Sequence, residues 1–404
     1  MNPQNPMKFR RFGRTELQIP VFSCGGMRFQ QGWDGNIAFA AIERENQQRL
    51  EATIYRALEL GINHIETARG YGPSEMQLGH ILPALPREKL IVQTKVGPHE
   101  NPQEFLVNLE KSMANLKLDY IDLFGFHGIN TLELLDQVVR PGGCLDVIRR
   151  FQKDGRVRHV GFSTHGPSDV IAAACNTGEF DYVNVHYYFV NQFNWPAIEA
   201  ATANDMGVFI ISPTDKGGML QTPSQKMKDL CAPLSPMAFN DLWCLNHPQI
   251  HTLSVGADKP ADFDAHIEAL QFYDAIPQAI APVEAKLRGE VVRTFDENWA
   301  KNWSQGIPEH GEIEGDVNVR EILRILTYGK SFDLIEWARG RYNLLGNAGH
   351  WGPGENLKAV DDEAKWQAIS QKMKQSPFAT QIPAYLQEAH ELFSGEEKQR
   401  LSKS

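Results

Sequence analysis

The stretch Gly61–Gly79, GINHIETARGYGPSEMQLG, contains the structural unit from which the fold of this chain can be predicted. The apolar run at 62–65 predicts a short buried strand, and Pro73-Ser74-Glu75 marks the start of a helix. Glu66 and Tyr71 lie between them, on the loop that leaves the strand. An acid and a phenol at this position indicate either local capping and packing or chemistry that needs partners elsewhere in the chain.

Apolar runs of similar length recur as far as residue 257. Most are continuous rather than alternating, which is typical of strands buried on both faces. Together with INHIE (62–66), eight runs predict strands: VFSCGG (21–26), LIVQTK (90–95), IDLFGFH (121–127), VRHVGFS (157–163), YVNVHYY (182–188), VFIIS (208–212) and TLSVGA (252–257).

Stretches of helical length with one apolar face separate these runs. The apolar stripes are Leu50, Ile54, Ala57 and Leu58 in one stretch, and Phe105, Leu109, Met113 and Leu116 in another. Eight strands that alternate with helices over about 250 residues predict an α/β fold, the (β/α)8 TIM barrel. A doubly wound open sheet is the alternative, but it requires a GxGxxG turn after the first strand, and CGGMRF (24–29) lacks that pattern.

The pattern changes after about residue 275, where the strand-like runs end. VREILRILTYGKSFDLIEWARGRYNLLG (319–346) and IPAYLQEAHELFSG (382–395) predict helices. We therefore predict a barrel domain at residues 1–279 and an all-helical C-terminal domain at residues 280–404.

Composition limits the functions to consider. The 404 residues carry a formal charge of -10, which disfavours nucleic acid as a partner. The sequence has five scattered Cys and no CxxC, so we expect neither a disulfide framework nor a bound metal. The N-terminus lacks the apolar core of a signal peptide, and no run of about 18 apolar residues predicts a membrane span. A cytoplasmic location is the expectation.

Polar residues stand where three successive strands end. Glu66 ends the second strand, with Tyr71 on the following loop, while Lys95 ends the third and His127 the fourth. Because a barrel gathers its catalytic groups at the carboxyl ends of its strands, we expect these four side chains to converge. Each of them alone fits a structural role equally well.

The four residue types suit the reduction of a carbonyl group. A free tyrosine titrates near pKa 10, and a lysine ammonium beside it stabilises the phenolate. Glu66 would hold Lys95 in place and keep it charged, and His127 would donate a hydrogen bond to the carbonyl oxygen. Since no side chain supplies a hydride, we expect a nicotinamide cofactor to bring it.

These residues and their surroundings resemble the aldo-keto reductase family. The similarity runs from FRRFGRTELQIPVFSCGGMRF to about residue 270 and rests on motifs in a fixed order: GINHIETARGYGPSE, LIVQTKVG, LKLDYIDLFGFH, DGRVRHVGFST and SVGADKPADFDAHIEAL. The resemblance implies a (β/α)8 barrel that reduces an aldehyde or ketone with NADPH. It implies that Tyr71 is the general acid, Lys95 its activator and His127 the substrate-orienting residue. Glu66 stands where the family usually has Asp.

The resemblance also implies a set of cofactor-binding positions, several of which depart from the family pattern. Ser163 and Thr164 replace Ser-Asn at the nicotinamide carboxamide, Asn184 replaces Gln, and Ile211 replaces an aromatic residue. Asp258, Asp262 and Asp264 surround Lys259 at the expected adenosine phosphate site, which leaves NADH as an alternative to NADPH. The remaining positions implied in cofactor binding are Ser212, Lys216, Gly256 and His266.

The C-terminal part resembles a subgroup of these reductases that carries a ferredoxin-like helical appendage. Iron-sulfur clusters need Cys ligands. This chain has no Cys after Cys244, and Ser376-Pro377 stands where Cys-Pro is expected. We therefore expect no iron-sulfur cluster.

Two other functions stay open. The barrel could be a catalytically degenerate binding or regulatory module whose helical domain contacts a protein partner. Alternatively, the same phenol and lysine could catalyse a lyase or isomerase reaction. For the reductase, the expected partner is a small carbonyl substrate whose fit depends on Met27, Arg28, Phe29, Trp33 and the tail.

Overall fold

A computed structural model describes residues 6–399, which form two compact units. The first unit contains residues 6–214 and 240–276, and the second contains residues 215–239 and 277–399. The second unit begins close to the boundary expected at residue 280. It also takes in residues 215–239, a segment that the sequence analysis counted with the barrel.

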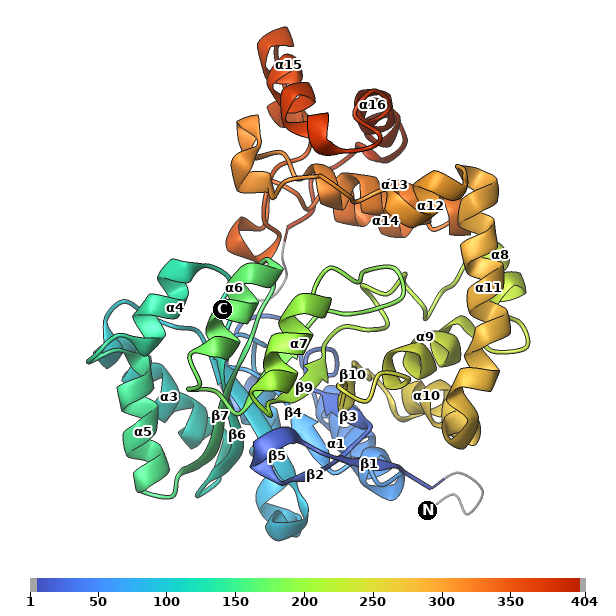
Figure 1. Cartoon of the computed structure of the whole chain (residues 1–404). Coiled ribbons are helices and arrows are strands. Elements are labelled where there is room, and N and C mark those ends of the chain that lie inside the picture. Colours follow the sequence, from blue (N-terminus) through green and yellow to red (C-terminus); the bar gives the residue numbers. More distant parts are fainter. Residues whose placement is uncertain (1–5, 400–404) are drawn as a thin grey trace. The chain divides into compact units, whose positions relative to one another are not determined.

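Eight parallel strands close into a barrel in the first unit, in the order β10-β3-β4-β5-β6-β7-β8-β9 (Figure 1). This confirms the TIM barrel and the order of all eight predicted strands. The strands are β3 Phe22–Gly25, β4 His64–Glu66, β5 Ile91–Val96, β6 Ile121–His127, β7 Val157–Ser163, β8 Tyr182–Val185, β9 Gly207–Ile210 and β10 Thr252–Val255. β8 ends three residues earlier than predicted.

Helices surround this barrel (Figure 1). All four stripe residues of α3 are buried, and the Phe105 ring packs against Phe124 and Phe126 of β6. Burying a side chain of this size stabilises the fold by roughly 1.5–3 kcal/mol. The α-helices are α1 Arg44–Glu59, α2 Ser74–Leu78, α3 Pro102–Leu116, α4 Leu132–Val139, α5 Cys144–Lys153, α6 Ser168–Asn176, α7 Trp195–Ala203, α9 Pro236–Leu245 and α10 Asp264–Ala269.

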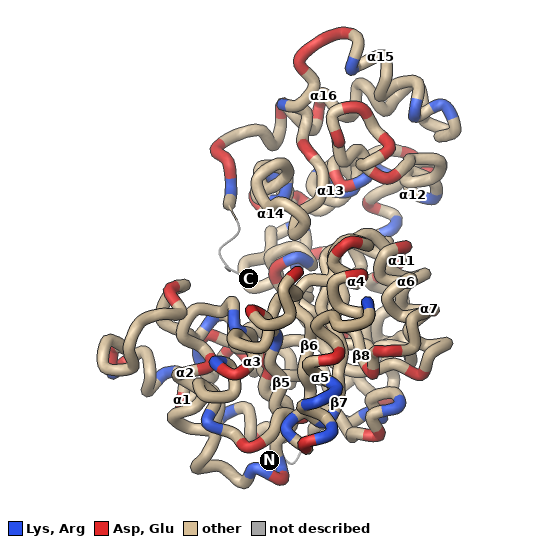
Figure 2. Tube along the Cα trace, turned by 90° about the vertical axis from the view of Figure 1, so that its left-hand side faces the viewer, with Lys and Arg blue, Asp and Glu red and all other residues tan. Residues whose placement is uncertain are grey.

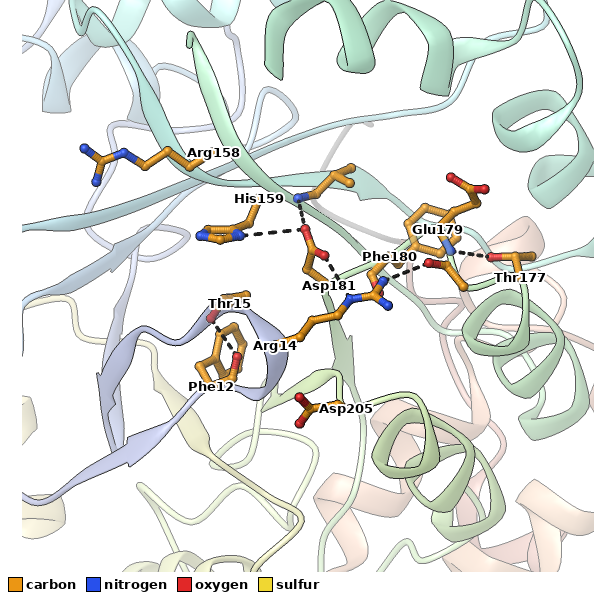
Figure 3. Close-up of polar contacts among 12 residues, drawn as sticks. Phe12, Arg14, Thr15, Arg158, His159, Thr177, Glu179, Phe180, Asp181 and Asp205 are labelled. Carbon is orange, nitrogen blue, oxygen red and sulfur yellow. Dashed lines mark hydrogen bonds and ion pairs between the residues drawn. The ribbon is translucent and has the colours of Figure 1, made fainter. Parts of the chain in front are cut away.

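A hairpin of β1 (Phe9–Arg11) and β2 (Gln18–Pro20) packs against the amino-terminal end of the barrel. Its connecting turn is fastened by Arg14, whose Nε donates to Asp181 Oδ1 over 3.0 Å (Figure 3). The other oxygen of Asp181 accepts the backbone N–H of Val160. One carboxylate therefore joins the hairpin to the middle of β7 and the start of β8. The Phe12 ring packs against Tyr182 beside it.

The barrel interior contains a layer of buried polar side chains. His64 contacts Ser23 through Nδ1 (2.6 Å) and Gln93 through Nε2 (3.0 Å), and Ser23 also contacts Thr252 (2.7 Å). Burial lowers the pKa of His64 to about 3, so its imidazole is neutral. With a neutral ring, Gln93 accepts from Nε2 and Ser23 donates to Nδ1.

The described residues of the second unit form helices joined by loops, with one isolated bridge between Val317 and Glu355. α13, α14 and α16 pack on one another, and Trp299 is buried with its Nε1 donating to Thr327. Ser224 and Ala232 tie the 215–239 segment to this unit through bonds with Phe332 and Lys286. Its α-helices are α8 Gln225–Cys231, α11 Ile276–Thr294, α12 Glu297–Asn302, α13 Val319–Phe332, α14 Ile335–Tyr342, α15 Glu363–Lys372 and α16 Ile382–Phe393.

Short 3-10 helices complete the described chain. They are η1 Gly13–Thr15, η2 Phe39–Ala41, η3 Leu82–Ala84, η4 Arg87–Lys89, η5 Pro260–Phe263, η6 Leu270–Ala275, η7 His310–Glu312, η8 Glu314–Asp316, η9 Gly349–Trp351, η10 Leu357–Ala359 and η11 Met373–Gln375. Figure 2 shows acidic and basic residues interspersed along the traces of both units. Within residues 6–399, no helix has the length and apolar character needed to cross a membrane.

Candidate active site

The loop after β4 runs alongside β5, and this brings Tyr71 close to Lys95. Thr67 and Arg69 continue the ladder beyond β4, since their N–H groups donate to the carbonyls of Gln93 and Lys95 (2.8 Å each). The chain then turns through Gly72, which has φ +53° and leaves no room for a Cβ beside the carbonyl oxygen of Gly32. Glycine is the residue that accepts both conditions at little cost.

Four residues meet at the carboxyl end of the barrel, as predicted. Lys95 Nζ forms an ion pair with Glu66, donates to the carbonyl of Thr67 (2.9 Å), and lies 4.8 Å from the centroid of the Tyr71 ring. The His127 ring meets the Tyr71 ring edge to face, with centroids 5.6 Å apart. Glu66, Lys95 and His127 are buried, while Tyr71 is partly exposed.

The electrostatics of the Lys95–Glu66 pair have two opposing parts. Burial lowers the pKa of Lys95 well below its ordinary value, because the ammonium loses its water. The carboxylate in contact with it favours the charged form. The ion pair with Glu66 therefore opposes the effect of burial on the ammonium beside the phenol.

Ser163 and Asn184 have buried polar atoms that the protein leaves unused. The two residues are register partners at the ends of β7 and β8, and Ser163 also pairs with His127 on β6. Among the described residues, neither the Ser163 hydroxyl nor either polar atom of the Asn184 amide has a hydrogen-bond partner. Leaving such groups unpaired costs about 1–3 kcal/mol each, so this pair is suited to bind an amide of a ligand.

The neighbouring positions are engaged within the protein. The Thr164 hydroxyl donates to the Ile129 carbonyl (2.8 Å) and accepts from the Gly166 N–H (3.0 Å), which fastens two loops together. Ile211 and Ser212 follow β9 and are half-buried, and Ser212 has a φ of +52°. The Ile211 carbonyl accepts from the Tyr188 hydroxyl.

At the end of β10 the three acids have partners other than the Lys259 side chain. Asp258 pairs with Arg49 (3.4 Å) and Asp264 with Arg56 (3.3 Å). Asp262 accepts the N–H groups of residues 258 and 259. Lys259 itself is exposed, and two of the three acids expected around it are paired with arginines.

Three other implied cofactor positions lie in different settings. Gly256 makes room for Arg28, whose Cδ and Nε would lie 3.2 Å from a Cβ at this position. His266 is buried, with Nδ1 2.6 Å from Asp241 Oδ2 and its ring against Phe22, which gives it a structural role. Lys216 belongs to the second unit, because it lies in the 215–239 segment.

Sequence reasoning missed two histidines at the ends of β7 and β8. His165 and His186 each stand two residues beyond an unpaired group, Ser163 or Asn184, and their ring centroids are 4.4 Å apart. His186 Nδ1 also contacts the Tyr188 hydroxyl at 2.5 Å. The equal offset in the segments STH and NVH was the available signal. Within residues 6–399, no group of three or more His, Cys, Asp or Glu side chains is arranged to hold a metal ion.

The barrel, with its polar groups at the carboxyl ends of the strands, defines a (β/α)8 enzyme scaffold. Residues 22–278 match the sequence profile described as the Aldo/keto reductase family, which is well over half of the chain. The chain belongs to this family, as the sequence motifs indicated.

Curated relatives are similar to parts of the chain. An NADH-specific methylglyoxal reductase of Escherichia coli (strain K12) is 24% identical over 235 residues, 52% of this chain and 68% of that enzyme. An L-galactose dehydrogenase of Arabidopsis thaliana is 31% identical over 198 residues, 43% of this chain and 58% of that enzyme. The matches thus leave between a third and a half of each relative's length unaligned.

Solved structures share the barrel. An aldo-keto reductase from Bacillus halodurans superposes with a TM-score of 0.57 at 19% identity, covering 69% of this chain and 96% of that chain. A putative aldo-keto reductase from Pseudomonas aeruginosa gives 0.53 at 22% identity, covering 67% and 98%. These similarities establish the fold.

Proposed function

We propose that this protein reduces an aldehyde or ketone to an alcohol with NAD(P)H, and that Tyr71 supplies the proton. The observation that carries the proposal is the convergence of the Tyr71 phenol, the Lys95 ammonium and the His127 ring at one end of the barrel. The matched family and the curated relatives, whose names are those of reductases and dehydrogenases, support it.

Each of the four side chains has a role in this reaction. Tyr71 donates its proton to the oxygen of the substrate as negative charge develops there. The Lys95 charge stabilises the phenolate that remains, and Glu66 keeps Lys95 protonated and in position. His127 donates a hydrogen bond to the same oxygen and orients the carbonyl.

The cofactor fits the residues beside this centre. When bound, a reduced nicotinamide supplies the hydride. Ser163 and Asn184 would pair with its carboxamide, since their buried polar atoms have no partner among the described residues. Ile211 and Ser212 would pack along the ring from the end of β9, and Thr164 would hold the backbone on which Ser163 lies.

We propose NADPH as the preferred cofactor. Asp258 and Asp264 are paired with Arg49 and Arg56, so their charges are partly balanced. Arg28, which lies beside Gly256, and Lys259, three residues further along the chain, would then provide positive charge for a 2′-phosphate. NADH is the alternative, as in the methylglyoxal reductase named above.

Two measurements test the proposal. The first titrates the protein with NADPH and, separately, NADH, following tryptophan fluorescence. The second follows oxidation of the reduced nicotinamide with methylglyoxal, aldose sugars and simple ketones, for wild type and Tyr71→Phe. We expect saturable binding of NADPH to both proteins and a loss of turnover of at least about 100-fold in the variant.

Equal inactivity of wild type and variant, with the cofactor still bound, would favour a binding or regulatory module over an enzyme. Absence of binding of either nucleotide at about millimolar concentration, a free energy near -4 kcal/mol, would contradict the reductase function.

A further inference from the structure

A cavity of about 370 Å³ lies against the loop that carries Tyr71, within the barrel unit. Pockets that bind small molecules begin at roughly 300 Å³. Its walls come from the loops after β3, β4 and β5 and from α3: Trp33, Asp34, Gly35, Asn36, Arg69, Gly70, Gly72, Val96, Gly97, Pro98, His99 and Asn108. Gly70 and Gly72 flank Tyr71, whose ring instead contacts Lys95 and His127 in the barrel mouth.

Arg69 is the cation of this cavity. Its side chain is 15% exposed, and within the described part of the chain its acidic partner is Glu75, with Oε2 3.4 Å from Nη1. That contact is long for a hydrogen bond, and a guanidinium has five N–H donors. Burial raises the pKa of Glu75, which weakens its hold on Arg69 by favouring the neutral acid.

The other titratable groups of the wall are engaged locally. His99 accepts the Asn101 N–H at Nδ1 (3.1 Å) and has Nε2 3.0 Å from Glu104. Asp34 accepts the N–H of Asn36 (2.9 Å). Lys111 donates to the side chain of Asn36 (3.0 Å), so a second cation contacts a residue of the wall.

We propose that this pocket, the Arg69 cavity, binds a small organic carboxylate with an apolar body. Arg69 would take the carboxylate in a bidentate pair, and the Asn36 and Asn108 amides would donate to it. The apolar body would lie on the Trp33 ring. The volume exceeds what a bare inorganic anion fills, which is why the ligand is an organic acid.

The ligand would act on the backbone that positions the proposed catalytic residues. The Arg69 N–H bonds the Lys95 carbonyl, and the Tyr71 N–H bonds the Ala68 carbonyl (3.1 Å). A carboxylate on Arg69 is therefore held two residues from Tyr71 without entering the barrel mouth. The binding itself requires no nicotinamide and no turnover, so it stands or falls separately from the proposed reaction.

Isothermal titration calorimetry of the full chain tests this site, with benzoate as the probe and benzyl alcohol as its uncharged match. We expect benzoate to bind at least tenfold more tightly than benzyl alcohol. Arg69→Gln should lower its affinity by about 10- to 100-fold, the worth of a charge-assisted bidentate pair. Arg150→Gln, at an exposed arginine of α5, is the matched control and should bind as wild type.

Two further variants separate the alternatives. Asn108→Leu narrows the cavity and should also weaken the binding of benzoate. This variant keeps the test valid if Arg69→Gln fails to fold. Tyr71→Phe should leave binding unchanged. The proposal would be overturned if binding survives both cavity variants or if Tyr71→Phe abolishes it. It would also be overturned if no binding is seen at about 20 mM, which corresponds to a binding free energy of about -2.3 kcal/mol.

Discussion

Two opposite effects act on the same ammonium group of Lys95. Enclosure in the barrel removes water and favours the neutral amine, whereas the contact with Glu66 favours the charged form. The longer Glu at a position where the family usually has Asp still reaches the lysine. Because breaking one partner of a buried pair leaves an uncompensated charge, Glu66 bears on both activity and stability.

Glu66→Gln should therefore lower kcat/KM and move the alkaline limb of its pH profile to lower pH, since Lys95 loses its proton more readily without the carboxylate. The barrel should also lose about 3 kcal/mol of unfolding free energy. Glu66→Asp, which keeps the charge, is the control and should retain most of the activity and most of the stability of wild type. Steady-state rates across pH and chemical denaturation measure these effects, and an unshifted alkaline limb in Glu66→Gln would contradict the role assigned to the pair.

At the scale of elements, the β1–β2 hairpin packs against the amino-terminal end of the barrel. Two of its arginines, Arg14 and Arg11, form ion pairs that differ in their exposure to solvent. Arg14 is two-thirds enclosed and bonds Asp181 as well as the carbonyls of Gly178 and Phe180. Arg11 also bonds two acids, Glu16 and Asp205, but in a more exposed position. Exposed pairs contribute little, while hydrogen bonds to enclosed charges contribute more.

Arg14→Gln should destabilise the barrel by about 1–3 kcal/mol, since Asp181 keeps its bond to Val160 but loses its cation. Arg11→Gln is the matched variant and should cause no measurable change. Urea denaturation of both variants at pH 7 makes the comparison. Equal losses in the two would show that enclosure does not decide the strength of these contacts.

The polar layer that joins β3, β4, β5 and β10 gives the barrel a pH dependence with a definite sign. His64 has a pKa of about 3 in the folded protein, because burial disfavours its charged form. In the unfolded chain it titrates near 6.5. As pH falls below about 6.5, His64 takes up a proton in the unfolded chain but not in the folded protein. The folded protein therefore becomes less stable.

Between pH 6.5 and 4.5 the titration of His64 should lower the unfolding free energy of wild type by about 2 kcal/mol, and His64→Gln should not show this loss. The difference in unfolding free energy between wild type and His64→Gln should therefore be about 2 kcal/mol smaller at pH 4.5 than at pH 6.5. Denaturation curves at the two pH values measure it, with His99→Gln, at a side chain that is 41% exposed, as the control. A deficit that stays constant would mean that His64 is protonated in the fold.

At the scale of the whole molecule, residues 215–239 belong with the helical unit although they lie between β9 and β10 in sequence. The buried side chains of this segment include Leu220, Met227 and Leu234. Ser224 donates to the carbonyl of Phe332 at the end of α13, and the Ala232 carbonyl accepts from Lys286 of α11. The two units are therefore joined by more than one crossing of the chain.

A chain that ends at residue 279 should consequently be less stable than the full protein and more prone to associate, because it exposes the apolar side chains of 215–239. A second truncation that also replaces 215–239 by a short Gly/Ser linker should recover solubility. Thermal unfolding and light scattering compare the three chains. If the first truncation melts like the full protein and stays monomeric, then the contacts between residues 215–239 and the helical unit do not contribute to stability.

The sequence by itself determined the eight strands, their order and the residue types at their ends. Continuous apolar runs and helical stripes are local patterns, and each run contains a strand whose apolar residues are buried. It also determined that Tyr71, Lys95, His127 and Glu66 share one end of the barrel, because all strands of a parallel barrel point the same way. Their catalytic roles and the cofactor contacts stay predictions.

Only the tertiary structure decided which polar atoms find partners. Spacing suggested that three acids crowd Lys259, but arginines of α1 reach two of them from 200 residues away in sequence. His266 matched a cofactor position and is buried against Asp241. The side-chain polar atoms of Ser163 and Asn184, on neighbouring strands, have no hydrogen-bond partner among the described residues. The physical reason is that local periodicity records which face of an element is apolar, while hydrogen-bond satisfaction depends on contacts formed when the barrel closes.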